Sequence, residues 1–421
     1  MNNLEYTSSD ESFNTSSKNS LYNSSEDDNK YNLHNLQGDI LNKYNIIEEI
    51  GRGGFSIVWL GYSIHDSNYY AIKVQNSDDF EEGLGEIKII KKLNHKNVTK
   101  LVDYFIEERF DDNNKIQKYI CSVYELCCGN LDGLARKGKY KNGFPSDMVF
   151  KFYNQMYDGM TYLHNKLKIF HGDIKPDNIL LKGINNRDKV LIDYYNQQDF
   201  NKKYNKIKKE YWLQKGNNIK NIKKMKTETR IKIRQTVHKK IIDEMASLDL
   251  VDNHKYYCDN KYFENPEIII TDFGNYCPDE EQFNESFGTT YYQAPEIILK
   301  GDCTKKVDVW ALGCTIYEFL KGKILFDPMS NNNQSEVENH LNLMINYCGS
   351  FNENFLRKCD RKRLFFDKKY RLVNGDFSNK IPINIFLENE FNGIENKEIW
   401  MNVISQMLKL YPKEREIPCI K

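Results

Sequence analysis

The chain has little of what marks a membrane protein, a disulfide-rich protein or a polyelectrolyte binder. Its 60 Lys and Arg residues balance 60 Asp and Glu residues, so the whole composition implies no polyanionic or polycationic partner. The ten Cys residues are scattered and form no C-x-x-C pair, which indicates reduced thiols instead of a disulfide framework or a zinc site. No apolar run approaches the length of a membrane span, and no repeats are visible. We therefore expect an intracellular protein, cytoplasmic or nuclear, without a membrane partner.

The hydrophobic pattern changes along the chain from extended to helical. Alternating and β-branched segments predict five strands, and 3–4 spacing of apolar residues predicts a helix at 81–93 that carries Glu86. After Gly129 the pattern becomes helical, with Ser146 as a candidate N-cap for an apolar stripe that ends near Leu163. Further helices are expected at 307–320, 336–347 and 397–410. The five predicted strands cover 44–50, 55–61, 69–74, 98–106 and 117–126.

Two segments do not fit this apolar pattern. Residues 1–37 are rich in Ser, Asn and Asp with few large apolar residues, which predicts a disordered segment. Residues 183–265 form a long insertion between two apolar strands, and its middle is dense in Lys. This insertion would suit nucleic acid or a nuclear-import signal, but a solvated loop is the simpler interpretation.

Five motifs follow one another in a fixed order. A glycine-rich turn begins at Gly51, a Lys73 stands inside an apolar strand, and His171-Gly-Asp173-Ile-Lys175-Pro-Asp-Asn178 comes next. Asp272-Phe-Gly274 and Ala294-Pro-Glu296 complete the set. The third motif spaces a proton acceptor, a Lys two positions later and an Asn five positions later, which is the arrangement that phosphoryl transfer requires. A charged Lys in an apolar strand is costly unless it is paired, so its position favours a functional role.

In this order the five motifs resemble those of the protein kinases. The resemblance implies that Asp173 orients the substrate hydroxyl and accepts its proton, and that Lys175 neutralises charge on the transferring phosphoryl group. It implies that Lys73 pairs with the ATP phosphates and with a glutamate of the helix at 81–93. Glu86 is preferred over Glu81 and Glu82 because it alone begins the apolar helical run Glu86-Ile-Lys-Ile-Ile90. Asn178 and Asp272 would supply oxygen ligands to Mg²⁺.

The resemblance also assigns the nucleotide site, with ATP and Mg²⁺ as the expected cofactors. Glycines let backbone N–H groups approach phosphates without a Cβ clash, although Ser56 stands at the third glycine position. Tyr124 would be the bulky residue behind the adenine. The Glu125 carbonyl and the Cys127 amide would form hydrogen bonds with the adenine. The expected nucleotide-binding residues are Ile50, Gly51, Arg52, Gly53, Gly54, Phe55, Ser56, Ile57, Val58, Ala71, Lys73, Glu125 and Cys127.

The implied fold is α+β, a bilobal protein-kinase fold. We expect an antiparallel small-lobe sheet with one key helix at 38–126, and a mainly helical large lobe at 127–182 and 266–421, interrupted by the insertion at 183–265. The same resemblance implies a buried ion pair between Glu296 and Arg415, and an Asp308 that holds the backbone of the catalytic loop.

Within the kinases, the chain resembles the SR-protein kinases and the Clk-like branch. The segments that show this resemblance are Gly38-Asp-Ile-Leu, Gly54-Phe-Ser-Ile-Val-Trp-Leu60, Asp272-Phe-Gly-Asn-Tyr-Cys277, Ile324-Leu-Phe-Asp-Pro328 and the long insertion. Lys175 and Thr289 are typical of serine/threonine kinases. Two positions depart from the usual pattern: Gly172 stands where most kinases have an Arg that reads a phosphate on the activation loop, and Gln293 replaces an Arg common in this group.

The resulting hypothesis is an ATP-dependent serine/threonine kinase that does not need activation-loop phosphorylation. Its substrates would be proteins, with basic or Arg/Ser-rich segments suggested by the resemblance and by the acidic run Asp279-Glu280-Glu281 with Glu285. We expect a monomer with no nucleic-acid partner. The alternatives are a catalytically inactive kinase-fold scaffold, which the intact motifs disfavour, and a small-molecule kinase, which Ala294-Pro-Glu296 disfavours.

Overall fold

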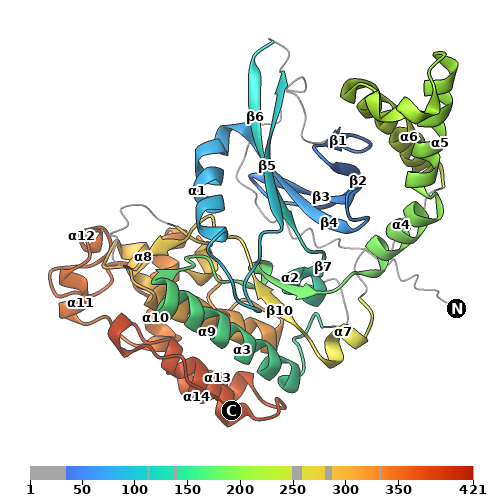
Figure 1. Ribbon diagram of the computed structural model, residues 1–421. Helices are drawn as coiled ribbons and strands as arrows, with labels where there is room; N and C mark the ends of the chain where they lie inside the picture. Colours follow the sequence, from blue (N-terminus) through green and yellow to red (C-terminus); the bar gives the residue numbers. More distant parts are fainter. Residues whose placement is uncertain are drawn as a thin grey trace, which may run out of the picture.

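The structure is a computed structural model that describes residues 35–110, 114–136, 140–248, 258–279, 287–330 and 333–420. A sheet-rich small lobe stands over a mainly helical large lobe (Figure 1). This arrangement confirms the expected α+β bilobal fold. Most of the segment 1–37, for which disorder was predicted, lies outside the described residues.

The small lobe is built on an antiparallel sheet of six strands in the order β1-β2-β3-β4-β6-β5. The sixth strand is the short β1, which the sequence pattern did not predict. The strand expected at 98–106 begins later, because Val98 forms a bridge with Ile270 of the large lobe and Thr99 N donates to the Ile270 carbonyl at 2.8 Å. The strands are β1 (Ile40–Leu41), β2 (Tyr44–Arg52), β3 (Ser56–Ser63), β4 (Tyr69–Gln75), β5 (Asp103–Phe110) and β6 (Ile116–Tyr124).

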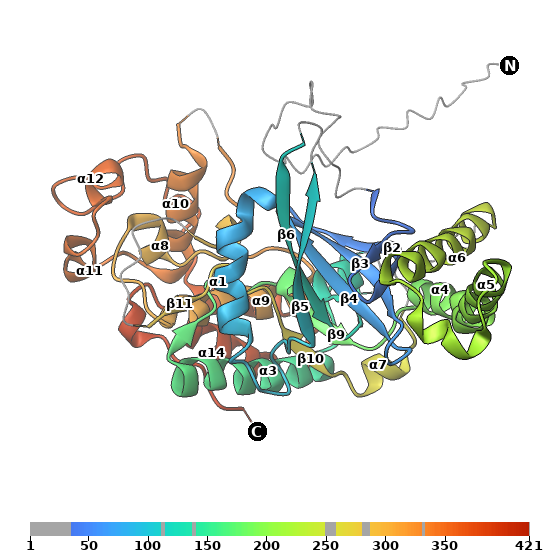
Figure 2. The same cartoon turned by 45° about the horizontal axis from the view of Figure 1, so that its top comes forward.

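The two faces of this sheet bury different side chains because residues alternate along each strand. Ile57 and Trp59 of β3 pack in one cluster with Ile72, whereas Leu60 and Tyr62 pack in another cluster. Helix α1 (Phe80–Ile90), the expected helix of the small lobe, packs beside β6 (Figure 2). It carries Glu86 on its buried side.

The large lobe is organised around α9, in which every residue from Val307 to Leu320 is buried. The predicted helices at 307–320, 336–347 and 397–410 are confirmed as α9, α10 and α14. Helix α3 buries the predicted apolar stripe with Val149, Phe152 and Met156 in the main core. The remaining described helices of the large lobe are short. The bounds are α2 (Leu131–Arg136), α3 (Ser146–Thr161), α7 (Lys261–Glu264), α8 (Pro295–Leu299), α9 (Lys306–Lys321), α10 (Glu336–Cys348), α11 (Glu353–Arg357), α12 (Lys362–Phe365), α13 (Ile383–Glu390) and α14 (Lys397–Met407).

Ser146 does not cap helix α3, so that prediction is wrong. The helix begins at Ser146 itself and Pro145 occupies the cap position. The Ser146 hydroxyl donates to the Glu395 carbonyl at 2.8 Å and accepts from the Trp400 indole at 2.8 Å. A tertiary contact with α14 therefore takes the hydroxyl that would have capped the helix.

The insertion is folded and packs against the small lobe, so the interpretation as a solvated loop is wrong for residues 186–247. Helices α4 (Asn186–Gln197), α5 (Phe200–Gln214) and α6 (Thr227–Ser247) lie beside β2 and β3 (Figures 1 and 2). Ile233, Val237 and Ile241 of α6 share one apolar cluster with Leu60 and Tyr62. Their four-residue spacing gives α6 a buried stripe despite its many lysines.

All ten cysteines are free thiols, as expected. Within the described ranges, no helix combines the length and the apolar character that a membrane crossing requires.

Candidate active site

The catalytic-loop motif lies between two short strands of the large lobe, β8 (Ile169–Phe170) and β9 (Ile179–Lys182). The buried carboxylate of Asp308 holds the beginning of this loop. It accepts from the backbone N–H of His171 at 2.8 Å and of Gly172 at 2.9 Å, and its Oδ2 lies 2.8 Å from His164 Nε2. This is the anchoring role that the sequence predicted for Asp308.

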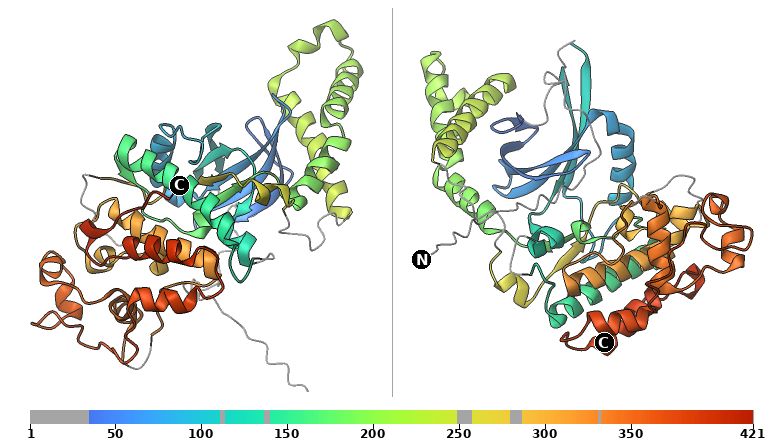
Figure 3. Two further views of the ribbon diagram at one scale, coloured as in Figure 1. Left: turned by 90° about the horizontal axis from the view of Figure 1, so that it is seen from below. Right: turned by 180° about the vertical axis from the view of Figure 1, so that it is seen from behind.

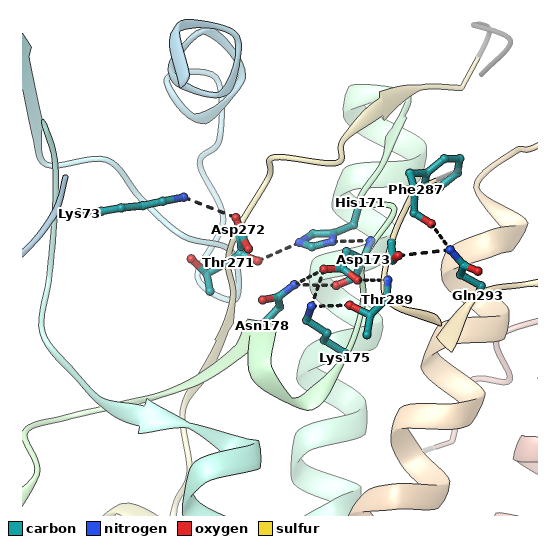
Figure 4. A network of polar contacts seen from close by, with 11 residues as sticks. Lys73, His171, Asp173, Lys175, Asn178, Thr271, Asp272, Phe287, Thr289 and Gln293 are labelled. Carbon is teal, nitrogen blue, oxygen red and sulfur yellow. Dashed lines mark hydrogen bonds and ion pairs between the residues drawn. The ribbon is translucent and has the colours of Figure 1, made fainter. Parts of the chain in front are cut away.

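Asp173 lies at the centre of a polar network, shown in Figure 4. One carboxylate oxygen accepts from the Thr289 backbone N–H at 2.8 Å. The other oxygen lies 2.8 Å from Lys175 Nζ and 3.1 Å from Asn178 Nδ2. Lys175 Nζ also donates to the Thr289 hydroxyl at 2.5 Å. Three donors from two segments of the chain thus fix the orientation of a carboxylate that is only 6% exposed.

Two glycines bring the catalytic loop and the segment carrying Thr289 into backbone contact. Gly172 has φ +82°, and a Cβ there would lie 2.4 Å from the Asn275 carbonyl oxygen. Gly288 has φ +75°, and a Cβ there would lie 2.6 Å from the Gly172 carbonyl oxygen. Both positions therefore require glycine. An Arg at position 172 would meet the same contact with Asn275, so this packing excludes an Arg beside Asp173.

Lys73 of β4 pairs with Glu86 of α1. The Nζ atom lies 3.1 Å from both carboxylate oxygens of Glu86 and 3.5 Å from Asp272 Oδ1. Desolvation alone lowers the pKa of Lys73, but Glu86 and then Asp272 outweigh it and hold that pKa above its ordinary value. The ammonium group is therefore a permanent positive charge between the lobes.

Asp272 follows β10 (Ile268–Ile270) and adopts an unusual backbone conformation. Its φ of +68° lies in the left-handed region, which costs a non-glycine residue roughly 1–3 kcal/mol and is found mainly at functional sites. Desolvation opposes its ionisation, but the nearby charge of Lys73 outweighs this effect and holds the pKa of Asp272 below its usual range. A side chain that is 48% exposed and remains anionic is available to a cation.

Asn178 and Asp272 have the chemistry of a magnesium site. Asn178 Nδ2 donates to the Asp173 carbonyl at 2.8 Å, which leaves the amide oxygen as the atom that can serve as a ligand. Asp272 adds an anionic oxygen. Mg²⁺ prefers few protein ligands together with water and phosphate oxygens. This fits the finding that the described part of the chain has no cluster of three or more His, Cys, Asp or Glu side chains arranged around a metal.

The glycine-rich turn joins β2 to β3 and is closed by the Gly53 N–H, which donates to the Ser56 carbonyl at 2.9 Å. Protein packing does not require glycine here. A Cβ would meet nothing closer than 3.6 Å at Gly51 or 3.8 Å at Gly53, and nothing within 4 Å at Gly54. None of these residues has a positive φ. A ligand that approaches the backbone closely is the remaining reason for glycine, and a triphosphate fits it.

The other expected nucleotide-binding residues lie on the strands around this turn and between the lobes. Ile50, Gly51 and Arg52 end β2, and Ser56, Ile57 and Val58 begin β3. Phe55 at the tip is 71% exposed. Ala71 shares β4 with Lys73. Glu125 lies in the connection after β6, and Cys127 is the first residue of β7 (Cys127–Asn130).

The structure gives three residues contacts that the sequence did not predict. Gln75 Nε2 donates to Glu86 at 2.9 Å, and its position two residues after Lys73 on the same face of β4 could have signalled this. Gln293 Nε2 donates to the carbonyls of Phe287 at 2.9 Å and Gly288 at 3.3 Å. Arg187 of the insertion donates to the Glu49 carbonyl at 2.9 Å, just before the glycine-rich turn. No local pattern predicts the last two contacts.

The expected ion pair between Glu296 and Arg415 is present and fully buried. The two guanidinium nitrogens lie 2.5 and 2.7 Å from the two carboxylate oxygens. The guanidinium also lies over the ring of Trp310 at 5.0 Å from its centroid. This pair joins α8 to the end of the described chain.

Comparison with known proteins agrees with this geometry. The sequence model of the protein kinase domain matches residues 44–212 and 258–417. The putative serine/threonine-protein kinase L205 of Acanthamoeba polyphaga mimivirus is 27% identical over 463 residues, covering 88% of this chain and 84% of the relative. The serine/threonine-protein kinase SRPK of Physarum polycephalum is 27% identical over 344 residues, covering 78% and 72%. The protein kinase dsk1 of Schizosaccharomyces pombe is 23% identical and covers 89% and 78%.

Proposed function

The chain belongs to the protein kinase domain family and is a serine/threonine kinase, and we propose that Asp173, Lys175, Lys73 and Glu86 carry its phosphoryl transfer. The observation that supports this most is the hydrogen-bonded network around Asp173. A carboxylate held by three donors is already oriented before substrate binds, which is how positioning catalysis lowers a barrier. The inactive-scaffold alternative is not favoured, since every catalytic side chain is present and paired.

Asp173 accepts a hydrogen bond from the attacking Ser or Thr hydroxyl and takes its proton as the oxygen bonds to the γ-phosphorus. The bond from that phosphorus to the bridging oxygen of ATP breaks, and ADP leaves with the electron pair. Lys175 stabilises the negative charge on the transferring oxygens, and its contact with the Thr289 hydroxyl keeps it beside Asp173.

Members of this family use ATP and typically Mg²⁺. We assign the phosphates to the glycine-rich turn and Lys73, and the metal to Asn178 and Asp272. Bound Mg²⁺ would neutralise phosphate charge as it develops. Within the protein, Glu86 and Gln75 hold Lys73 toward this position, and the backbone of Asp272 aims its carboxylate at the same space.

The first test is Asp173→Ala, which removes the oriented proton acceptor. We expect kcat to fall roughly 10²-fold or more, because general base catalysis contributes about 10²–10⁴, while ATP binding is retained. A radiolabelled phosphate assay measures turnover and nucleotide titration measures binding. Near-normal turnover by this variant would refute the assignment.

A second pair of variants tests the nucleotide side of the site. Lys73→Met removes a phosphate-pairing charge and Asp272→Ala removes a metal ligand, so both should abolish activity. Melting temperatures separate this effect from unfolding. If both variants melt normally and transfer phosphate at the wild-type rate, the ATP and metal assignments are wrong.

We further propose that activity does not require phosphorylation of the activation segment. Gly172 cannot read a phosphate, and Thr289 is already held by Asp173 and Lys175 without one. Phosphatase-treated enzyme should remain active, as should a Thr290→Ala variant. A lag that prior autophosphorylation removes would contradict this. Ser286, another candidate phosphosite, lies outside the described residues.

The substrate class remains a proposal: proteins with basic, Ser-containing segments. Glu280, Glu281 and Glu285 of the acidic run lie outside the described residues. Its first member, Asp279, accepts a hydrogen bond from the Lys305 backbone N–H at 3.0 Å. Better support comes from Asp177, which is exposed at the end of the catalytic loop. Glu318 lies close to it, but Glu318 is buried and already paired with Arg136 at 3.1 Å, so it does not attract a substrate.

An Arg-Ser repeat peptide and an acidic Ser peptide, assayed at low and moderate salt, test the substrate proposal. Surface charge pairs contribute only about 0–1 kcal/mol each and are screened by salt. We expect kcat/KM to favour the basic peptide and the preference to shrink with salt. Equal values would leave a serine/threonine kinase of other specificity. A monomer in the cytoplasm or nucleus remains a prediction.

A further inference from the structure

The insertion concentrates positive charge that the rest of the chain balances. Residues 201–240 contain 15 Lys and Arg residues against Glu210 and Glu228, a formal net charge of +13. Because the whole chain is neutral, the other 381 residues carry the opposite charge. The chain is therefore neutral as a whole, but its positive charge is concentrated in the insertion and its negative charge lies in the rest.

These charges lie on helices that extend away from the kinase body (Figure 3). Eleven exposed lysines lie on α5, on α6 and on the segment between them, which includes the short 3₁₀ helix η5 (Ile219–Lys224). We call these eleven lysines the basic surface. Its members are Lys202, Lys206, Lys209, Lys215, Lys220, Lys223, Lys224, Lys226, Lys232, Lys239 and Lys240. The buried stripe of α6 faces the small lobe, so its lysines are left to solvent.

The protein does little to neutralise this charge. For basic residues between 201 and 240, the one ion pair among the described residues joins Lys203 to Glu244 at 4.0 Å. Arg230 lies near Lys208 instead of near a carboxylate, and burial together with this like charge lowers the pKa of Lys208. Arg230 Nε is buried without a hydrogen-bond partner. Like charges without counter-charges repel one another, so an anionic partner would relieve this repulsion.

The shape of the basic surface favours a long anion over a compact one. Helix α6 has 21 residues and is about 30 Å long, and lysines lie along about two thirds of it, from Lys226 at its beginning to Lys240. Phosphodiester backbones offer charges at regular short spacing over such lengths. Exposed Tyr211 and the amides of Asn205 and Gln214 lie among the lysines, as in surfaces that bind single strands.

A membrane surface fits less well. The exposed apolar side chains of this region are Ile207, Tyr211, Leu213, Ile219 and Ile231. Ile207 and Tyr211 lie one turn apart on α5, but Leu213 lies on another side of that helix. No further exposed apolar residue extends this pair along α5. Helices that lie in a membrane interface need a continuous apolar face.

We propose that the basic surface of the insertion binds the phosphodiester backbone of nucleic acid. This revises the expectation of no nucleic-acid partner, which rested on the neutrality of the whole chain and on the interpretation of the insertion as a solvated loop. Binding would recruit the kinase to proteins on the same strand, and it requires no step of phosphoryl transfer. The proposal therefore stands or falls independently of the proposed catalytic residues.

The test uses the full chain and fluorescence anisotropy with a labelled 20-nucleotide single-stranded RNA, a DNA of the same sequence and a 20-base-pair DNA duplex. Comparison of these probes identifies the preferred form. The charge-loss variant is Lys220→Gln, Lys223→Gln and Lys224→Gln combined. The matched control removes three exposed lysines of the large lobe, Lys368, Lys369 and Lys380. Melting temperatures verify that both variants are folded.

We expect wild type and control to bind alike, with affinity that falls steeply as salt rises. Each phosphate contact contributes about −0.7 to −0.9 to the slope of log K against log salt, so losing three lysines should make that slope shallower by about 2. We expect the charge-loss variant to bind at least roughly tenfold more weakly at 100 mM salt. No binding at 50 mM salt, or equal loss in the control, would overturn the proposal. Tighter binding to phosphatidylserine vesicles, or to a peptide of residues 1–34, would also overturn it.

Discussion

The catalytic loop should tolerate no side chain at position 172. In Gly172→Ala the new residue must adopt φ +82°, a left-handed conformation that costs about 1–2 kcal/mol for an L-residue. Its Cβ would also lie 2.4 Å from the Asn275 carbonyl oxygen, and overpacking of this kind costs about 1–3 kcal/mol. Together these effects predict a loss of about 2–5 kcal/mol or a displaced loop.

A matched control separates the two effects. Gly393 has the same φ of +82°, but a Cβ there would meet nothing within 4 Å. Gly393→Ala should therefore show only the backbone cost of about 1–2 kcal/mol and keep normal turnover. Gly172→Ala should melt lower than this control.

The kinetic consequence follows from the position of Gly172 beside Asp173. If the loop moves to relieve the contact, Asp173 moves with it, and a displacement of about 1 Å can cost 10²-fold in rate. We expect kcat to fall at least roughly tenfold, measured with saturating ATP and a peptide substrate. If Gly172→Ala melts and turns over like Gly393→Ala, the contact with Asn275 is not required and the reasoning is refuted.

Three further predictions concern buried polar groups. Asp308→Asn loses one of the acceptors for the N–H groups of the catalytic loop, so kcat should fall while Trp fluorescence still reports a folded chain; unchanged kcat would contradict the anchoring role. Glu296→Gln leaves Arg415 buried with an uncompensated charge and should destabilise by about 3–5 kcal/mol, which denaturant unfolding measures; a loss under about 1 kcal/mol would contradict it. Burial lowers the pKa of His238, between α6 and the small lobe, to about 4. The unfolded chain therefore binds this proton first, and stability is lost as pH falls from about 6.5 to about 4. His238→Gln should weaken this acid dependence of the melting temperature, and an unaltered dependence would count against it.

Much of the fold follows from local periodicity. Strands β2, β3, β4 and β6 and the helices α1, α9, α10 and α14 were predicted because each buries one face, or all faces, against a neighbour. The strand at 98–106 was misplaced because Val98 pairs with β10 of the other lobe, and that pairing joins residues far apart in the chain. The insertion was misread for a related reason: its lysines dominate the composition, whereas a few apolar residues at four-residue spacing decide its packing.

The amino-acid sequence by itself determined which chemistry is available, because Asp173, Lys175, Asn178 and Asp272 are recognisable from short spacings. Only the tertiary structure decided how these groups are held. The contacts of Thr289 with Asp173, of Gln293 with the Gly288 carbonyl and of Gly172 with Asn275 join residues far apart in the chain or depend on backbone dihedral angles. Spacing along a chain encodes neither distance nor direction between separate segments. The roles of these contacts therefore become visible only once the separate segments of the large lobe have packed together.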